Sequence, residues 1–215
     1  MEVVRAVPEF LASYLDFVLE FSRRPMEAVK SNTTITAEGQ QLISGKLIGF
    51  SAMSVGFGIA IVQIGSALGM AEDPSLLLKV LSRIEEKLLP FAAVVAITAL
   101  GCIAHVSLYI GALVSRALGE QRFSGSASGS INATTAFSTW VIPVFTALIV
   151  GFRVAAAHSG VHTLAFLLIV GPFCIAFFIY LVAAFAAAHR TTPGQIGSVF
   201  GFTVVLFVLV GKLFE

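Results

Sequence analysis

The positions of the acidic residues constrain this chain more than any other feature of its sequence. All twelve Asp and Glu residues lie outside five long apolar segments. Each segment approaches or exceeds the roughly 20 residues that an α-helix needs to cross a bilayer core. The five segments are residues 47–70, 88–114, 136–157, 161–188 and 195–211. A soluble domain of 215 residues has no means of burying them all, so the sequence predicts an all-α, polytopic transmembrane helix bundle with five spans.

The distribution of Lys and Arg predicts the orientation of this bundle. Five spans put the two termini on opposite sides of the membrane. With the N-terminus inside, eight of the thirteen basic residues lie on the cytoplasmic side and five on the other. The positive-inside rule therefore predicts a cytoplasmic N-terminus and an outer C-terminus, in a bacterial inner membrane or an organelle membrane. The glycosylation sequons at Asn32 and Asn132 both fall on the cytoplasmic side of this topology, so neither is expected to carry sugar.

Residues 1–45 are predicted to form a cytoplasmic or interfacial region, separate from the bundle of residues 46–215. The polar side chains of residues 9–21 fall on one narrow stripe of a helix, while aromatic and aliphatic side chains cover nearly all the rest. The stripe consists of Glu9, Ser13, Asp16 and Glu20. Such a helix is too apolar for water and too acidic to span, so we expect it to lie in the membrane interface or pack under the bundle.

The sequence also predicts the structure of three segments outside the spans. Residues 31–36 are predicted to form a polar linker, in which Thr36 caps the helix of the first span. Residues 72–90, between the first two spans, predict a second interfacial amphipathic helix that begins at Asp73 and Pro74. Residues 123–135 are small and polar, and predict the most flexible loop of the chain.

Polar side chains within the spans are the first functional candidates in a membrane protein. His105 lies in the middle of the second span. It would either relay protons or bind a ligand, or else donate one hydrogen bond to a neighbouring helix. Gln63 in the first span offers the same choice, with an interhelical hydrogen bond as the simpler interpretation. A solute pathway would bring these two together with the other polar residues of the spans: Thr98, Ser107 and Thr146.

The sequence contains no arrangement typical of a catalytic or metal site. His158 and His162 have the spacing of two helical metal ligands, but the Ser-Gly between them predicts a turn, and no carboxylate or cysteine lies nearby. Paired carboxylates, a nucleophile next to a base and a zinc-protease motif are all missing. We therefore expect no enzyme, no cofactor and no metal. A net charge of +1 without a basic run also predicts no nucleic-acid partner.

Glycine residues recur four positions apart on the first and fifth predicted spans. Such ridges let helix backbones approach closely, which matters because lipid supplies no hydrophobic drive for helix association. These two spans are therefore predicted to pack most tightly, within the chain or against a partner. The candidate packing positions are Gly45, Gly49, Gly56, Gly65, Gly69, Gly197 and Gly201.

Three segments resemble the Yip1-domain superfamily of small five-span membrane proteins. They are YLDFVLEFSRRPMEAVK (residues 14–30), TAFSTWVIPVFTALI (residues 135–149) and AAAHRTTPGQIGSVFGFTVVL (residues 186–206). The overall layout is also similar: an amphipathic N-terminal region, five spans, and an N-in, C-out arrangement. The Asp-Leu-x-Gly-Pro and Tyr-Gly-Tyr motifs of eukaryotic trafficking members have no counterpart here. The resemblance thus implies a non-enzymatic membrane protein that organises, shapes or escorts other components, without a vesicle-budding role.

The residues and the resemblance favour the same function. We expect an accessory or scaffold-like subunit that acts through contacts with the lipid bilayer and with other membrane proteins or copies of itself. The alternative is a small passive channel or transporter subunit, which needs polar groups from several spans to converge at mid-membrane. Ion-coupled transport by this chain alone is not expected, because coupling needs an intramembrane group that changes charge and His105 is the single mid-span candidate.

Overall fold

The computed structural model is all-α, and it describes residues 2–37, 40–69, 89–117, 126–159 and 163–213. Within these ranges the chain forms seven helices and one isolated bridge, between Ile35 and Gln41. Four of the described helices are long and apolar enough to cross a membrane. The protein is therefore a multi-pass helical membrane protein.

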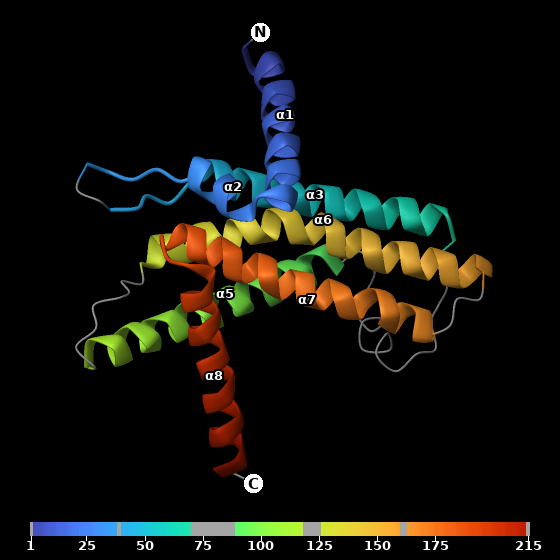
Figure 1. The fold of residues 1–215 in the computed structure, drawn as a ribbon. Coiled ribbons are helices and arrows are strands. Elements are labelled where there is room, and N and C mark those ends of the chain that lie inside the picture. The colour runs from blue at the N-terminus through green and yellow to red at the C-terminus, as the bar shows by residue number, and fades with distance from the viewer. Residues whose placement is uncertain (1, 38–39, 70–88, 118–125, 160–162, 214–215) are drawn as a thin grey trace.

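A layer of three long helices forms the body of the molecule (Figure 1). The helices are α3 (Gly45–Ala67), α6 (Ala127–Ser159) and α7 (Thr163–Ala188). Helix α6 is central, because it packs against α3 and α7 and also against α5 (Leu89–Ala117), which lies beside the layer. The four candidate spans are α3 itself and parts of the other three helices: Val94–Leu113, Ala127–Ala155 and Gly171–Ala188.

Helix α6 begins well before the predicted third span. The loop predicted over residues 123–135 is wrong from Ala127 onward, since the rest of that segment forms the first turns of α6. Its hydroxyls bond to the helix's own carbonyls, as Thr134 does to Ser130 and Thr135 to Ile131, both at 2.8 Å. Small side chains with their hydroxyl groups satisfied in this way suit a helix surface that packs closely.

Helix α1 (Glu2–Arg23) stands crosswise to the layer and continues through Arg24 into α2 (Pro25–Ser31) (Figure 1). The predicted helix over residues 9–21 is confirmed as part of α1. Its aromatic side is buried against the bundle, with Tyr14, Phe17 and Phe21 at most 2% exposed. Its acidic stripe is largely exposed, as predicted, with Ser13 partly covered.

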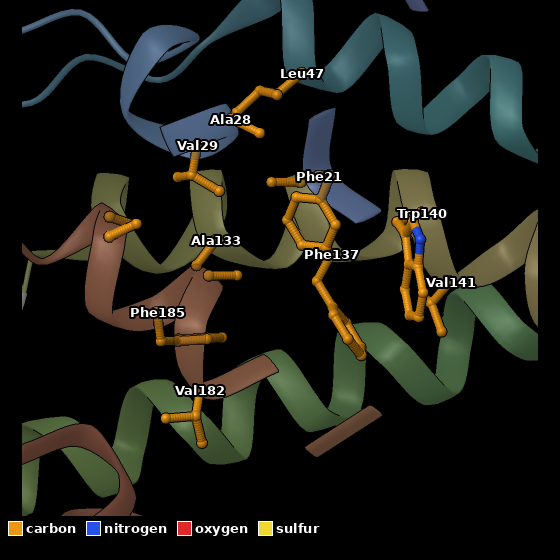
Figure 2. Close-up of a cluster of buried hydrophobic side chains, with 14 of the residues drawn as sticks. Phe21, Ala28, Val29, Leu47, Ala133, Phe137, Trp140, Val141, Val182 and Phe185 are labelled. Carbon is orange, nitrogen blue, oxygen red and sulfur yellow. The ribbon is translucent and has the colours of Figure 1, made fainter. Parts of the chain in front are cut away.

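The buried core lies where the first two helices meet the central layer. Figure 2 shows Phe21 of α1 in one cluster with side chains from α2, α3, α6 and α7. The indole nitrogen of Trp140 donates a 2.8 Å hydrogen bond to the hydroxyl of Ser22, and the Tyr180 hydroxyl donates to the Ser22 carbonyl. The Trp140 and Tyr180 rings stack with their centroids 4.5 Å apart. These contacts fix the C-terminal end of α1 on α6 and α7.

Residues 34–36 pair with residues 40–42 ahead of α3. The amide of Thr36 donates to the Gln40 carbonyl, and the amide of Leu42 donates to the Thr34 carbonyl. The cap of α3 is Ser44, whose hydroxyl accepts from the Leu47 amide at 3.3 Å. The predicted cap at Thr36 is therefore wrong, because Thr36 pairs with Gln40 and α3 begins only after Ser44. The predicted interfacial helix of residues 72–90 lies almost entirely outside the described residues.

Helix α8 (Pro193–Leu213) covers the predicted fifth segment, but it leaves the layer crosswise, on the side away from α1 (Figure 1). A capping box opens it, in which Thr192 and Gln195 each bond the other's backbone amide. Among the described residues α8 is not one of the four candidate spans, so a fifth crossing is not shown.

Close helix approaches occur at Gly101, which was not predicted, and at Gly49, which was. A Cβ at Gly101 of α5 would lie 2.4 Å from the Thr134 hydroxyl of α6, and one at Gly49 would lie 2.9 Å from the Phe10 ring of α1. Gly65 is buried in α3, and Gly69 follows that helix at a φ of 76°. A Cβ would meet nothing within 4 Å at the other four candidates: Gly45, Gly56, Gly197 and Gly201. Of the predicted positions, Gly49 thus lies at a close helix approach, whereas Gly45, Gly56, Gly197 and Gly201 do not among the described residues.

Candidate functional site

The polar centre of the described structure is a chain of three hydrogen-bonded side chains, two from α5 and α6 and one from the residue that follows α7. The Nδ1 atom of His105 on α5 lies 2.8 Å from the hydroxyl oxygen of Ser130 on α6. The same hydroxyl lies 3.1 Å from Nε2 of His189, the residue that follows α7. Because a hydroxyl both donates and accepts, Ser130 can donate to one imidazole while it accepts from the other.

The network separates two pockets of different character. A pocket of about 510 Å³ between α5 and α6 has mostly apolar walls, with His105 and Ser130 among its polar members. A pocket of about 440 Å³ on the other side is polar and is lined by His189 and Arg190 with Gln41 and residues of the α6 start. The network therefore links an apolar cleft between two spans to a polar surface at the end of the bundle.

The local backbone positions His189. The Thr191 amide bonds to the Ala186 carbonyl at 2.9 Å, and the Arg190 amide bonds to the Ala187 carbonyl at 3.2 Å. This pair of bonds is a Schellman motif, and it ends α7 with Arg190 at a φ of 53°. The ring is held close to α6 at Gly129, where a Cβ would lie 2.9 Å from the imidazole. A small residue is therefore needed there for His189 to reach Ser130.

The other predicted polar candidates do not join this network. Gln63 of α3 is exposed. The Ser107 hydroxyl bonds back to the Ile103 carbonyl, and Thr146 is buried on α6. Thr98 lines the same cleft as His105. The structure thus brings together two of the five residues that a solute pathway would need.

Ser130 and His189 were missed by the sequence analysis. Both lie in segments predicted to be loops, so neither was weighed as a partner of His105. No pattern in the sequence pairs Ser130 with either histidine, because its place on a helix is known only once α6 is seen to begin at Ala127. The pairing of residues 59 positions apart depends on the packing of α6 against α7.

The described residues include no group of three His, Cys, Asp or Glu side chains placed to hold a metal ion. The side chain of His158 and the whole of His162 lie outside the described residues, so the structure gives no geometry for that pair. What the three-residue network can do chemically is hold the helix ends together and pass a proton between two imidazoles through a hydroxyl.

We expect the folded protein to lose stability as the pH falls from 6.5 towards 4. Burial, and next the charge on neighbouring His105, lower the pKa of His189 from 6.5 to about 4. The unfolded chain therefore takes up this proton at a higher pH than the folded protein does. The stabilisation is complete above pH 6.5 and is lost progressively below it, by up to about 3 kcal/mol.

The measurement is the free energy of unfolding in detergent across this pH range. His189→Gln keeps a hydrogen-bonding group near Ser130 but does not titrate, so its profile should be flatter than that of the wild type. Equal slopes for the two proteins would show that His189 does not cause the pH dependence.

Comparison of the chain with protein-family models, with curated proteins and with solved structures finds no match. The fold and the site nevertheless define a class: a multi-pass helical membrane protein with a His–Ser–His network where α5, α6 and the end of α7 meet.

Proposed function

We propose that this protein is a non-enzymatic accessory or membrane-organising subunit of the kind that the Yip1-like resemblance implies. The observation that carries the proposal is the three-sided surface of α1. Its aromatic side is buried on the bundle and its acidic side faces away. A third side is apolar and exposed, with Leu15 at 48% and Leu19 at 55% exposure. That leucine side is free to enter a lipid leaflet or to bind another membrane protein.

The polar residues of the bundle support the same proposal, because many are engaged in fastening helices. Ser54 of α3 donates to the Thr139 carbonyl of α6 at 2.7 Å and bonds to the Tyr14 hydroxyl of α1 at 3.0 Å. The Ser51 and Ser138 hydroxyls lie 2.6 Å apart between α3 and α6. Bonds of this type stabilise a scaffold, and they leave fewer groups to line a solute path.

The proposed topology retains five spans with the N-terminus in the cytoplasm. Helix α8 is apolar on all sides over residues 199–210, unlike the amphipathic α1, and such a helix suits a span better than an interface. A fifth crossing requires α8 to lie along α3, α6 and α7 instead of crosswise to them as in Figure 1. The start of α6 and the end of α7 share one pocket with Gln41, which precedes α3. This gathering of helix ends fits spans that alternate in direction, with Arg190 and Lys30 on the cytoplasmic side.

The alternative of a small passive channel or transporter subunit has one observation in its favour. The cleft between α5 and α6 has a volume of about 510 Å³ and contains Thr98 and His105. It is mostly apolar, and Gln63 lies elsewhere on the exposed surface of α3. We therefore place this function second.

The test compares partner recovery for the wild type and a Leu11→Gln, Leu15→Gln, Leu19→Gln variant, each purified in mild detergent. Because these side chains are exposed, the variant should fold, and it should lose a partner or lipid that the wild type retains in near-stoichiometric amount. Glu9→Gln on the acidic side of α1 is the matched control. Equal recovery from all three proteins, together with solute flux in vesicles of the pure wild type, would favour the channel instead. A reporter fused after Glu215 that proves cytoplasmic would refute the proposed topology of five spans with a cytoplasmic N-terminus.

A further inference from the structure

Two cationic side chains line one pocket at the end of the bundle where α7 ends. The pocket has a volume of about 340 Å³. It is lined by Lys30 of α2 and by Arg190, which follows α7. Among the described residues, no Asp or Glu oxygen lies within 4.0 Å of either cation. The ion pair found in that part of the chain joins Arg24 to Glu27 instead. Within the ranges that the structure describes, the pocket therefore carries positive charge without a counter-ion.

Hydrogen-bonding side chains complete the wall of this pocket. Thr33 lines it from just after α2, Gln41 lines it from the segment before α3, and Thr191 follows Arg190. The Thr191 hydroxyl is buried and has no hydrogen-bond partner in the described part of the chain. A buried hydroxyl without a partner is costly. Rotation of the Thr191 side chain would let this hydroxyl donate to a ligand oxygen in the pocket.

The backbone at Arg190 points in the same direction. Arg190 occupies the left-handed position of the Schellman motif at a φ of 53°, where glycine is the usual residue because it has no Cβ. An arginine kept in a conformation that favours glycine indicates a use for its guanidinium, since local strain persists mainly where function requires it.

We propose that this pocket binds a phosphate group, carried either by an anionic phospholipid or by a soluble phosphate compound. A guanidinium presents paired donors that match phosphate oxygens, and a lysine ammonium adds a second charge. The neighbouring pocket of about 440 Å³ shares Gln41 and Arg190, so there is room beside the phosphate for a larger headgroup.

The position of the pocket, at the end of a candidate span, favours the phospholipid as the source of the phosphate. Ala187 lines the pocket and belongs to the last turn of the candidate span Gly171–Ala188, where lipid headgroups lie. With the orientation of the proposed function, this end faces the cytoplasmic leaflet, which is rich in anionic lipids. The phosphate chemistry of the pocket does not depend on that orientation.

The experiment measures lipid retained by the purified protein in native mass spectrometry, after addition of equal amounts of phosphatidylglycerol and phosphatidylcholine. The test variant combines Lys30→Gln with Arg190→Gly. Glycine suits the backbone at residue 190, so the variant loses the guanidinium without straining the turn. Arg24→Gln removes an exposed, paired cation and serves as the control. We expect the wild type and the control to prefer phosphatidylglycerol, and the test variant to bind it roughly tenfold to thirtyfold more weakly.

A second arm distinguishes the two sources of phosphate. Inorganic phosphate is added to each protein, and the melting temperature is recorded. If phosphate raises the melting temperature of the wild type but not of the test variant, while lipid retention is equal in both, the ligand is a soluble phosphate. If the test variant matches the wild type in both arms, or if Arg24→Gln weakens binding as much, the phosphate site is refuted.

Discussion

Replacing Phe21 by alanine is expected to detach the C-terminal half of α1 from the bundle. The Phe21 ring is fully buried, and its centroid lies 6.1 Å from that of Trp140 and 5.9 Å from that of Tyr180. Truncation of a buried phenylalanine leaves a cavity as well as less buried surface, and costs about 3–5 kcal/mol. The loss should be felt first at α1, because Phe21 is the last buried residue of that helix (Figure 2).

Trypsin provides the measurement, since the bond after Arg23 lies directly beyond the anchored turn. The rate of cleavage there should rise steeply in the Phe21→Ala protein. Leu19→Ala is the matched control, because Leu19 lies on the same helix but is 55% exposed. Its cleavage rate should stay close to that of the wild type. Similar rates for the two variants would show that burial of Phe21 does not hold α1 in place.

The sequence predicted α1 well because the chemistry of each of its sides is uniform. Glu9, Asp16 and Glu20 repeat at helical spacing, and all three are exposed. The stripe, however, could not show which apolar side packs on protein. The structure buries the aromatic side with Tyr14 and leaves the leucine side open. That difference depends on shape, because planar rings fill the space against Phe50 of α3, and hydropathy alone does not distinguish the two sides.

The candidate site was only half predictable, for a different physical reason. His105 is a titratable group within an apolar span, so the sequence alone identifies it as a candidate. Its partners were not, because Ser130 and His189 are ordinary residues until α6 and α7 bring them within 3.1 Å of each other. The small polar segment before the third span was misjudged by its lack of apolar side chains. Within the packed bundle, the same smallness lets α5 approach α6 at Gly101.

Asn132 shows most clearly what that segment does. The residue is fully buried near the start of α6. Its side-chain oxygen accepts from the Ser44 amide at 2.9 Å, and its amide nitrogen donates to the Leu42 carbonyl at 2.8 Å. One side chain thus satisfies a donor and an acceptor of the segment that opens α3. A glycan on the Asn132 side chain would be incompatible with these bonds, so Asn32 is the better reporter of orientation.

Asn132→Ala is therefore expected to lower the free energy of unfolding in detergent by about 1–3 kcal/mol, because the partly buried Ser44 amide and the Leu42 carbonyl lose their partner at once. Hydrogen exchange should rise at Ser44 and across the first turn of α3. Ser51→Ala is the matched control on the same interface. It removes one hydroxyl, and Ser138 keeps its 2.9 Å bond to the Thr135 carbonyl, so the expected loss is about 1 kcal/mol or less. If Asn132→Ala costs no more than Ser51→Ala, then water or a local shift replaces the lost bonds, and the start of α3 is held by apolar packing at Leu47 and Phe50 instead.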